Sequence, residues 1–454
     1  MQSLLDQSNL TQLAERLVAA ARRAGADQAD ALAVRSVALS VEVRDGAVEE
    51  SQRSEGDDLG LRVIVGHKQA VVSTNDLKGV GFDTLAERAV AMARSAPDDR
   101  FAGLADTKDL ARDVAQEMAA LDLLDPDMPD VALLEARARE AEASGLAVRG
   151  VTKSDGASAS AYIGGLVLVT SHGFHGATIA SRHGISMTAI AGDGTGMERD
   201  YDFSSTLHAS DLEKAQAIGR RAGERAVERL NPRKVTTRRV PVVLDSRISG
   251  SIVGHVASAA NGSAIARGTS FLREKLGEKI LSSGIHIIDD PLRPRGLRSR
   301  PFDVEGIAGR SRHLVEHGVL KTWILDCATA RELGLRTTGH AQRGVSSMPS
   351  PGVSNLHMTP GSKSPHELIA DIADGFYVTD MIGMGVNLVT GDYSRGASGF
   401  WIENGERTYP VSEVTIAGHL SEMFASLVPA NDLVFRYGTN APTLRIEGMT
   451  VAGQ

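Results

Sequence analysis

The chain has 454 residues, more than one hydrophobic core usually organises, so we expect two or three domains. Its formal net charge is -8, whereas nucleic-acid-binding proteins usually carry a surplus of basic residues that neutralise phosphates. This balance argues against a nucleic-acid partner. Arginines do recur over 220–239, but they alternate with Glu224 and Glu228, and we interpret this stretch as a solvated helix face followed by a linker.

Cysteine content and hydropathy restrict the compartment. Cys327 is the one cysteine, so no disulfide can form within the chain. The N-terminal segment is amphipathic, carries Glu15 and Arg16, and lacks the basic start of a secretory signal. No run of about 18 apolar residues occurs, and we therefore expect no membrane contact. Together these features predict a cytoplasmic protein.

The first part of the chain mixes helix and strand patterns. Helical spacing of apolar residues over 10–24 and over 82–95 predicts two helices. Between them, two strand patterns at 36–43 and 59–65 flank the hairpin signal Asp45-Gly46. The polar, proline-broken stretch 97–129 is interpreted as a linker with one short helix.

A second group of elements follows this linker. It comprises a helix over 130–144, strands rich in glycine and serine over 158–171 and 176–190, and a charged helix over 211–229. Asn231-Pro232 ends that helix and gives the clearest domain boundary. The expected domains are an N-terminal αβ domain at 1–232 and a second domain at 233–454.

The second domain has a different pattern. A buried strand at 240–244 precedes a small, apolar segment at 246–260, and short apolar runs separated by glycine, proline and aspartate continue to the end. One helix stands out at 365–374, with Ser364 and Glu367 as a capping box. The predicted fold class is α+β, with a split N-terminal αβ domain followed by a β-rich C-terminal domain.

The segment His313-Leu314-Val315-Glu316-His317 matches the H-x-x-E-H signature of inverted zinc peptidases. That chemistry needs a helix, which places both imidazoles on one face and lets the glutamate reach the metal-bound water. Here Gly318 follows directly, and residues 319–325 alternate as in a strand. A strand would separate the two histidines by about 13 Å, too far to share one ion. We therefore predict a hairpin turn at 316–318 and a chance match.

Three further features are weaker. The run Gly192-Asp193-Gly194-Thr195-Gly196 resembles a phosphate loop, but no lysine follows it, so we expect a tight loop after a strand. His172 and His175 would lie on opposite faces of a strand, which argues against a metal site shared with His183. His255 stands among glycine and alanine in an apolar segment, where an isolated histidine is more often structural than a ligand.

From about residue 235 to the C-terminus, the chain resembles proteins of the TldD/PmbA family, and the N-terminal half resembles them more loosely around Arg44-Asp45-Gly46 and Gly60-Leu61-Arg62-Val63. The C-terminal marks fit the family in order and spacing. They are Pro241–Asp245, Trp323–Asp326, Ala328–Gly334, Thr338-Gly339, Ser354–Leu356, Pro360-Gly361, Gly391–Ser394, Gly399–Gly405 and Asn431–Leu433.

The resemblance also shows what this chain lacks. In the TldD branch, the segment matching 255–260 reads H-E-x-x-x-H; its histidines bind zinc, its glutamate is the general base, and a cysteine near the C-terminus completes the site. Here His255 is kept, but Val256 replaces the glutamate and Ala260 replaces the second histidine. The stretch 435–442 contains no cysteine.

One imidazole cannot hold a catalytic zinc ion, which usually needs three protein ligands and an open water position. We therefore expect no catalytic and no metal-ligating residue in this chain, a pattern that the resemblance places on the PmbA (TldE) branch. Cys327 lies far in sequence from the position of the missing cysteine.

The resemblance implies a non-catalytic subunit, a pseudoenzyme that pairs with a TldD-type catalytic subunit. The expected heterodimer is a zinc metalloprotease whose zinc lies in the partner, and its substrates are unfolded peptides and the precursors of peptide antibiotics. Two alternatives stay open. One is an independently active metallopeptidase with an unrecognised site, and the other is a direct regulator of DNA gyrase.

Overall fold

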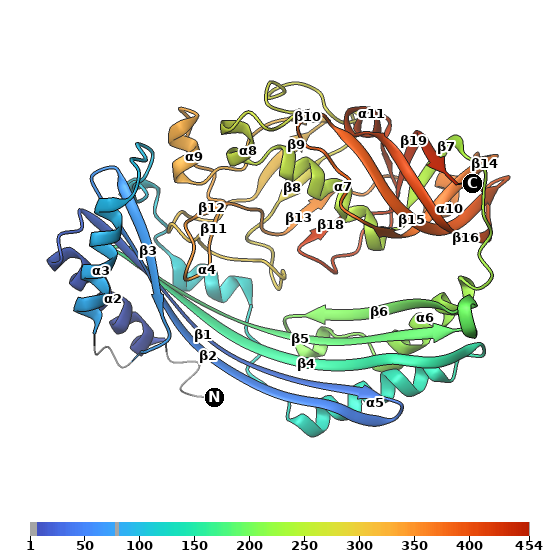
Figure 1. The fold of residues 1–454 in the computed structure, drawn as a ribbon, viewed down its shortest axis with the longest axis horizontal. Coiled ribbons are helices and arrows are strands. Elements are labelled where there is room, and N and C mark those ends of the chain that lie inside the picture. Colours follow the sequence, from blue (N-terminus) through green and yellow to red (C-terminus); the bar gives the residue numbers. More distant parts are fainter. Residues whose placement is uncertain (1–6, 78–80, 454) are drawn as a thin grey trace.

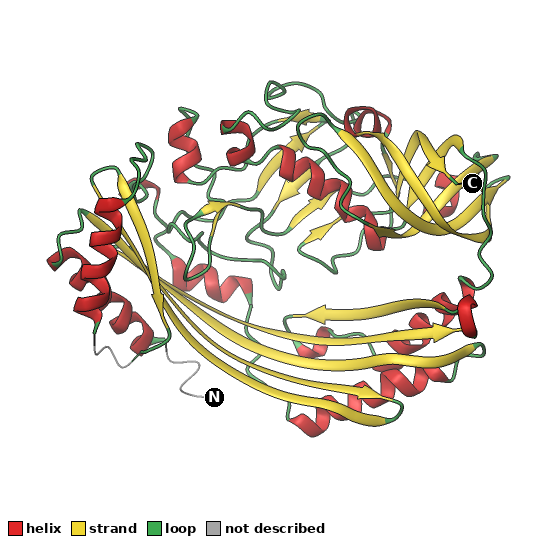
Figure 2. Ribbon diagram, viewed as in Figure 1, coloured by secondary structure: helices red, strands yellow, loops and turns green. Residues whose placement is uncertain are grey.

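The computed structural model describes residues 7–77 and 81–453, and these residues form two halves that face each other (Figures 1 and 2). A long, curved sheet with helices makes the N-terminal half, and a β-rich body covers the concave face of that sheet. The first six residues of the amphipathic N-terminus lie outside the described ranges. Within those ranges, no helix is both long and apolar enough to cross a bilayer.

The N-terminal sheet is antiparallel throughout, with the order β3-β2-β1-β4-β5-β6. Its hairpin between β1 and β2 turns at Asp45 and Gly46, whose φ angles of 52° and 72° suit a tight connection and confirm the expected turn. The strands are β1 Gln28–Arg44, β2 Ala47–Val65, β3 Lys68–Thr74, β4 Val151–Thr170, β5 His175–Ala191 and β6 Glu198–Thr206.

Four helices cover the outer face of this sheet in two pairs (Figure 1). The pair α2 (Ser8–Arg23) and α3 (Phe82–Ser95) packs on β1 to β3, and the pair α5 (Val131–Leu146) and α6 (Ala215–Glu228) packs on β4 to β6. A Cβ atom on Gly219 would lie 1.8 Å from the carbonyl oxygen of Ala141, so glycine there lets α5 and α6 touch through their backbones.

The stretch 97–129 connects the two groups of strands and contains η1 (Thr107–Asp109) and α4 (Val114–Leu121). It also contacts the C-terminal half, where Leu110 bridges Ile307 and Arg295 pairs with Asp122 at 2.6 Å. Two further short turns, η2 (Gly194–Gly196) and η3 (Ala209–Asp211), flank β6.

The C-terminal half is built on two sheets. One runs β16-β15-β14-β7-β19-β17, and an additional β16–β19 pairing closes five of its strands into a barrel; the other runs β10-β9-β8-β13-β18. The elements are β7 Arg238–Leu244, α7 Ser246–Ala259, α8 Gly262–Ala266, β8 Ile287–Asp289, β9 Arg312–Glu316, β10 Val319–Leu320, α9 Cys327–Glu332, β11 Ala341–Gln342, β12 Ser350–Pro351, β13 Leu356–Met358, α10 Pro365–Ile369, β14 Asp374–Ile382, β15 Asp392–Glu403, β16 Glu406–His419, α11 Leu420–Ser426, β17 Val428–Pro429, β18 Thr439–Asn440 and β19 Leu444–Ala452. The α+β class with a β-rich C-terminal part is confirmed.

Two expected elements differ in extent. The strand predicted over 319–325 stops at Leu320, because Trp323, Ile324 and Leu325 are buried in succession and Ile324 bridges Asn261 instead. The helix predicted over 365–374 ends at Ile369, although its capping box of Ser364 and Glu367 forms as expected. Consecutive burial and early termination both depend on tertiary packing, which local spacing does not reveal.

A buried polar group joins the two halves at the centre of the sheet. The Asp30 carboxylate of β1 binds the guanidinium of Arg62 on β2 at 2.6 Å and that of Arg343 from the C-terminal half. Burial opposes ionisation of Asp30, but these two cations outweigh it and lower its pKa. A Cβ atom on Gly60 would lie 1.9 Å from the Val345 carbonyl oxygen, so β2 touches the C-terminal half directly.

Glu305 is buried in the same region and accepts a hydrogen bond from the Cys327 backbone N–H at 2.8 Å. Burial, and then the nearby Asp303 carboxylate, raise the pKa of Glu305 to about 7, although Arg62 opposes this rise. The folded chain therefore holds a proton on Glu305 at pH values where the unfolded chain has released it.

We predict that Glu305→Gln removes a pH-dependent loss of stability. With a folded pKa above the unfolded value, Glu305 contributes stability below about pH 4.5 that is lost as the pH rises through about 7. The unfolding free energy of the variant should be close to that of the wild type near pH 5. At pH 8 it should be higher, by at most about 3 kcal/mol. Urea unfolding at both pH values measures this difference, and equal differences at pH 5 and 8 would contradict it.

Candidate functional site

Helix α7 and its C-cap Ala260 contain the positions that the resemblance matches to the zinc motif of the TldD branch. It begins directly after β7, where the Asp245 carboxylate accepts a hydrogen bond from the Arg247 N–H at 2.9 Å and caps the first turn. Val256 and Ala260 are fully buried and belong to the hydrophobic core of the C-terminal half. The two positions that would carry polar groups in a zinc motif therefore face apolar neighbours.

His255 points to a different environment. Its ring meets the Tyr393 ring edge-on, with 5.8 Å between centroids, and its Nε2 is buried without a hydrogen-bond partner. Burial, and then the guanidinium of Arg395, lower the pKa of His255 to about 4. The imidazole is therefore neutral near pH 7, and the charged group that acts on it is a cation.

The C-terminal stretch 435–442 does lie against α7, as the resemblance implies for the segment that carries the cysteine in the TldD branch. Ser249 donates a hydrogen bond to the Ala441 carbonyl at 3.1 Å, and β18 packs on the helix. The stretch has no cysteine to offer, and Cys327 packs with Ala105 and Ile307 in a separate cluster. These residues do not fit a zinc ion, because His255 has the Arg395 guanidinium beside it and belongs to no group of metal-ligating side chains in the part of the chain that the structure describes.

The other histidines are distributed as follows. His317 and Gly318 form the β9–β10 turn with φ angles of 50° and 79°, which confirms the hairpin prediction. His313 and His317 both approach His286, with ring centroids 5.6 Å and 4.5 Å from it, a proximity that the sequence pattern did not indicate. In the described ranges, no three His, Cys, Asp or Glu side chains have a metal-binding arrangement.

His172, His175 and His183 do not meet. His172 lies in the β4–β5 turn rather than on a strand, so the expected alternation with His175 does not apply. His175 pairs with Glu15 at 3.0 Å, whereas His183 is buried against Asp125 at 3.3 Å. The Gly192–Gly196 run forms the loop between β5 and β6, as expected.

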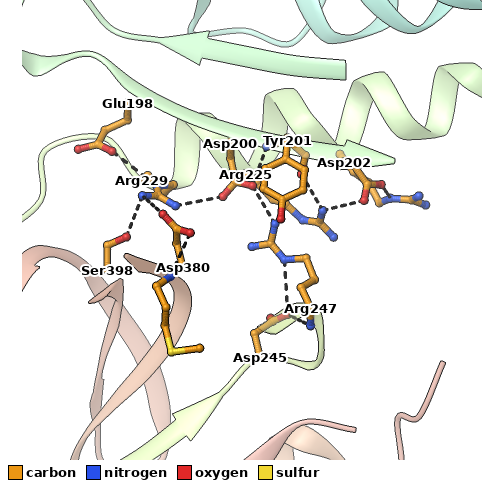
Figure 3. A network of polar contacts seen from close by, with 12 residues as sticks. Glu198, Asp200, Tyr201, Asp202, Arg225, Arg229, Asp245, Arg247, Asp380 and Ser398 are labelled. Carbon is orange, nitrogen blue, oxygen red and sulfur yellow. Dashed lines mark hydrogen bonds and ion pairs between the residues drawn. The ribbon is translucent and has the colours of Figure 1, made fainter. Parts of the chain in front are cut away.

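A network of ion pairs holds α7 over the N-terminal sheet (Figure 3). The Asp200 carboxylate on β6 binds Arg247 of α7 at 2.8 Å and Arg229, just after α6, at 3.3 Å. Arg229 also donates to Ser398 of β15 at 2.8 Å. One carboxylate therefore connects both halves through two arginines.

Asp202 repeats this arrangement two residues along β6. It binds Arg221 at 2.5 Å and Arg225 at 3.0 Å, both from α6, and Arg436 from the C-terminal half at 3.0 Å. Burial opposes its ionisation, but Arg225 and Arg221 outweigh that effect and lower the pKa of Asp202. The carboxylate stays charged and keeps all three cations in place.

These contacts correct one sequence interpretation. Only part of the arginine-rich helix is a solvated face: Arg220 is 65% exposed, whereas Arg229 is 13% exposed and paired. The sequence does contain a pattern that indicates these ion pairs. Acidic residues at 198, 200 and 202 share one face of a strand, and arginines at 221, 225 and 229 share one face of a helix.

We predict that His255→Gln flattens the acid side of the stability profile. The unfolded chain protonates His255 below about pH 6.5, whereas the folded chain does so only near pH 4, so wild-type stability falls as the pH drops through this window. Between pH 7.5 and 4.5, the unfolding free energy of the neutral variant should fall by up to about 3 kcal/mol less than that of the wild type. Urea unfolding tests this, with exposed His67→Gln as control; identical slopes for wild type and His255→Gln would contradict it.

The chain matches known protein families over most of its length. Three models of PmbA/TldA metallopeptidase domains match it: domain 1 at 29–93, the central domain at 124–230 and the C-terminal domain at 237–453. Metalloprotease PmbA of Escherichia coli O157:H7 is 34% identical and covers 94% of this chain and 93% of its own, and a PmbA homolog of Haemophilus influenzae is 33% identical over 98% and 97%.

Solved structures agree with these relatives. A candidate modulator of DNA gyrase from Bacteroides thetaiotaomicron is 29% identical, covers 98% of both chains and superposes with a TM-score of 0.89. TldE from Thermococcus kodakarensis shares the fold, with a TM-score of 0.85 at 19% identity over 97% of this chain and 100% of its own. The chain therefore belongs to the PmbA/TldD metallopeptidase family, on its PmbA (TldE) branch.

Proposed function

We propose that this chain is the non-catalytic subunit of a TldD/TldE-type heterodimeric zinc metalloprotease. The observation that carries the proposal is the state of the motif on α7: Val256 and Ala260 are core residues, and His255 is a neutral imidazole beside Arg395. Water activation by zinc needs several ligands and a nearby general base. None of these groups accompanies His255, so the chemistry is assigned to a TldD-type partner.

In this proposal, zinc lies in the partner subunit and the two chains form a composite cleft. The substrates would be unfolded peptides and the precursors of peptide antibiotics, whose backbones are free to pair with a strand edge. A stable, obligate interface of this kind typically buries more than about 2,000 Å². The single, buried Cys327 suits the reducing cytoplasm, where we expect the pair to act.

The proposal predicts the activity of the isolated chain and of the mixture with its partner. This chain alone should not cleave an unstructured substrate, and mixing it with a TldD-type subunit should restore cleavage, because only the partner holds the catalytic groups. Replacing the partner's motif glutamate should abolish the activity of the mixture. Chelator-sensitive cleavage by this chain alone, in preparations free of partner, would instead support the independently active peptidase.

The proposal also predicts what happens when motif residues are restored on α7. Val256→Glu with Ala260→His restores two motif groups but buries both in an apolar core, so we expect a loss of at least about 2 kcal/mol in unfolding free energy. The double variant should gain no stoichiometric zinc. Calorimetry and elemental analysis measure the two outcomes, with exposed Ser258→Glu on the same helix as control. Full stability with one zinc per chain would refute the assignment.

A further inference from the structure

We propose that the cavity beside α7 binds the carboxylate of an extended peptide. The cavity has a volume of about 620 Å³ and lies between β5 and β6 on one side and α7, β14 and β15 on the other. Volumes of about 300–1,000 Å³ are usual for ligand sites. The proposal concerns binding by this chain itself and does not depend on its pairing with a TldD-type subunit.

The walls of the cavity are cationic. The charged lining residues are Arg182, Arg247, Arg298, Arg395, Arg436 and Asp380. Arg247 and Arg436 are neutralised by the aspartates of β6, and Asp380 approaches Arg229 at 3.8 Å.

The three other arginines are uncompensated. Throughout the described ranges, Arg182, Arg298 and Arg395 have no carboxylate within ion-pair distance. Arg182 donates instead to the Leu297 carbonyl at 2.9 Å, and the Nε of Arg395 is buried without any hydrogen-bond partner. Burial, and then the nearby Arg298, lower the pKa of Arg182.

Such an arrangement is unfavourable without an anion. Partly desolvated cations that face one another repel, and a buried donor without an acceptor forfeits a hydrogen bond. A carboxylate would relieve both, because the planar guanidinium matches its two oxygens. The three arginines therefore suit the cavity to an anionic group.

An aromatic wall and a free strand edge favour a peptide as the carrier of that group. Tyr201 and Phe203 stack with centroids 6.4 Å apart, and Phe203 meets Tyr437 edge-on at 5.4 Å. Both β6 residues line the cavity, and β6 is the last strand of its sheet, with no further strand of the described chain on its outer edge. At Tyr201 the backbone N–H donates to Asp200 at 2.7 Å and the carbonyl accepts from Arg225 at 3.2 Å. A peptide backbone can therefore pair with the part of the edge beyond Tyr201, whereas a nucleotide cannot.

Fluorescence anisotropy on the purified full chain tests the proposal. Three labelled, unstructured decapeptides differ only in charge: one ends in Phe with a free carboxylate, one is its C-terminal amide, and one is the amide with Glu beside Phe. We expect the first, the third, or both to bind at least about tenfold more tightly than the neutral amide. The comparison of the first with the third separates a terminal carboxylate from an acidic side chain.

The variant Arg298→Gln with Arg395→Gln should abolish this preference with little effect on the melting temperature, because neither lost charge has a carboxylate partner. As a control, Arg273→Gln removes one positive charge from an exposed position outside the cavity and should keep the preference. The proposal is overturned if the wild type binds no peptide at millimolar concentration, if the amide binds equally well, or if the folded double variant keeps its preference. Tighter binding of ADP at the same arginines would also overturn it.

Discussion

The relation between the two halves depends on two aspartates of one strand. Asp200 and Asp202 are almost completely buried, and each binds arginines from both halves of the chain. Figure 3 shows the two arginines of Asp200. Removing either carboxylate would take the central anion from half-buried arginines and leave them only the flanking carboxylates, such as Glu213 for Arg221 and Arg436. Breaking such a network typically costs more than the net stability it provides. We infer that these carboxylates serve mainly to define one orientation of the C-terminal half over the sheet.

That orientation places α7. Arg247 stands in the first turn of the helix and is held by Asp200, so the helix axis is tied to β6 at its N-terminal end. At the other end, Val256 and Ala260 pack in the hydrophobic core of the C-terminal half. Between these attachments the helix presents Ile248 and Ser251 to the cavity. The same contacts that join the halves therefore shape the space between them.

Structural features that depend only on neighbouring residues could be predicted from the sequence. The Asp45-Gly46 turn and the Ser364–Glu367 capping box both formed, because each depends on residues adjacent in the chain. The pairing of β6 with α6 was not found, although both spacings were visible, because periodicity does not say which strand meets which helix. The cavity left no sequence pattern, since Arg182, Arg298 and Arg395 come from three distant segments.

The helix positions that match the zinc motif also show how differently polar and apolar side chains would fit there. A zinc site requires polar groups in a partly buried position, and such groups are costly without their metal. The valine and alanine found at 256 and 260 need no metal partner and are fully packed in the core. His255 alone keeps a polar atom there, with its charge suppressed by burial and by Arg395. The helix therefore lies beside the cavity and contributes packing to the core at these two positions.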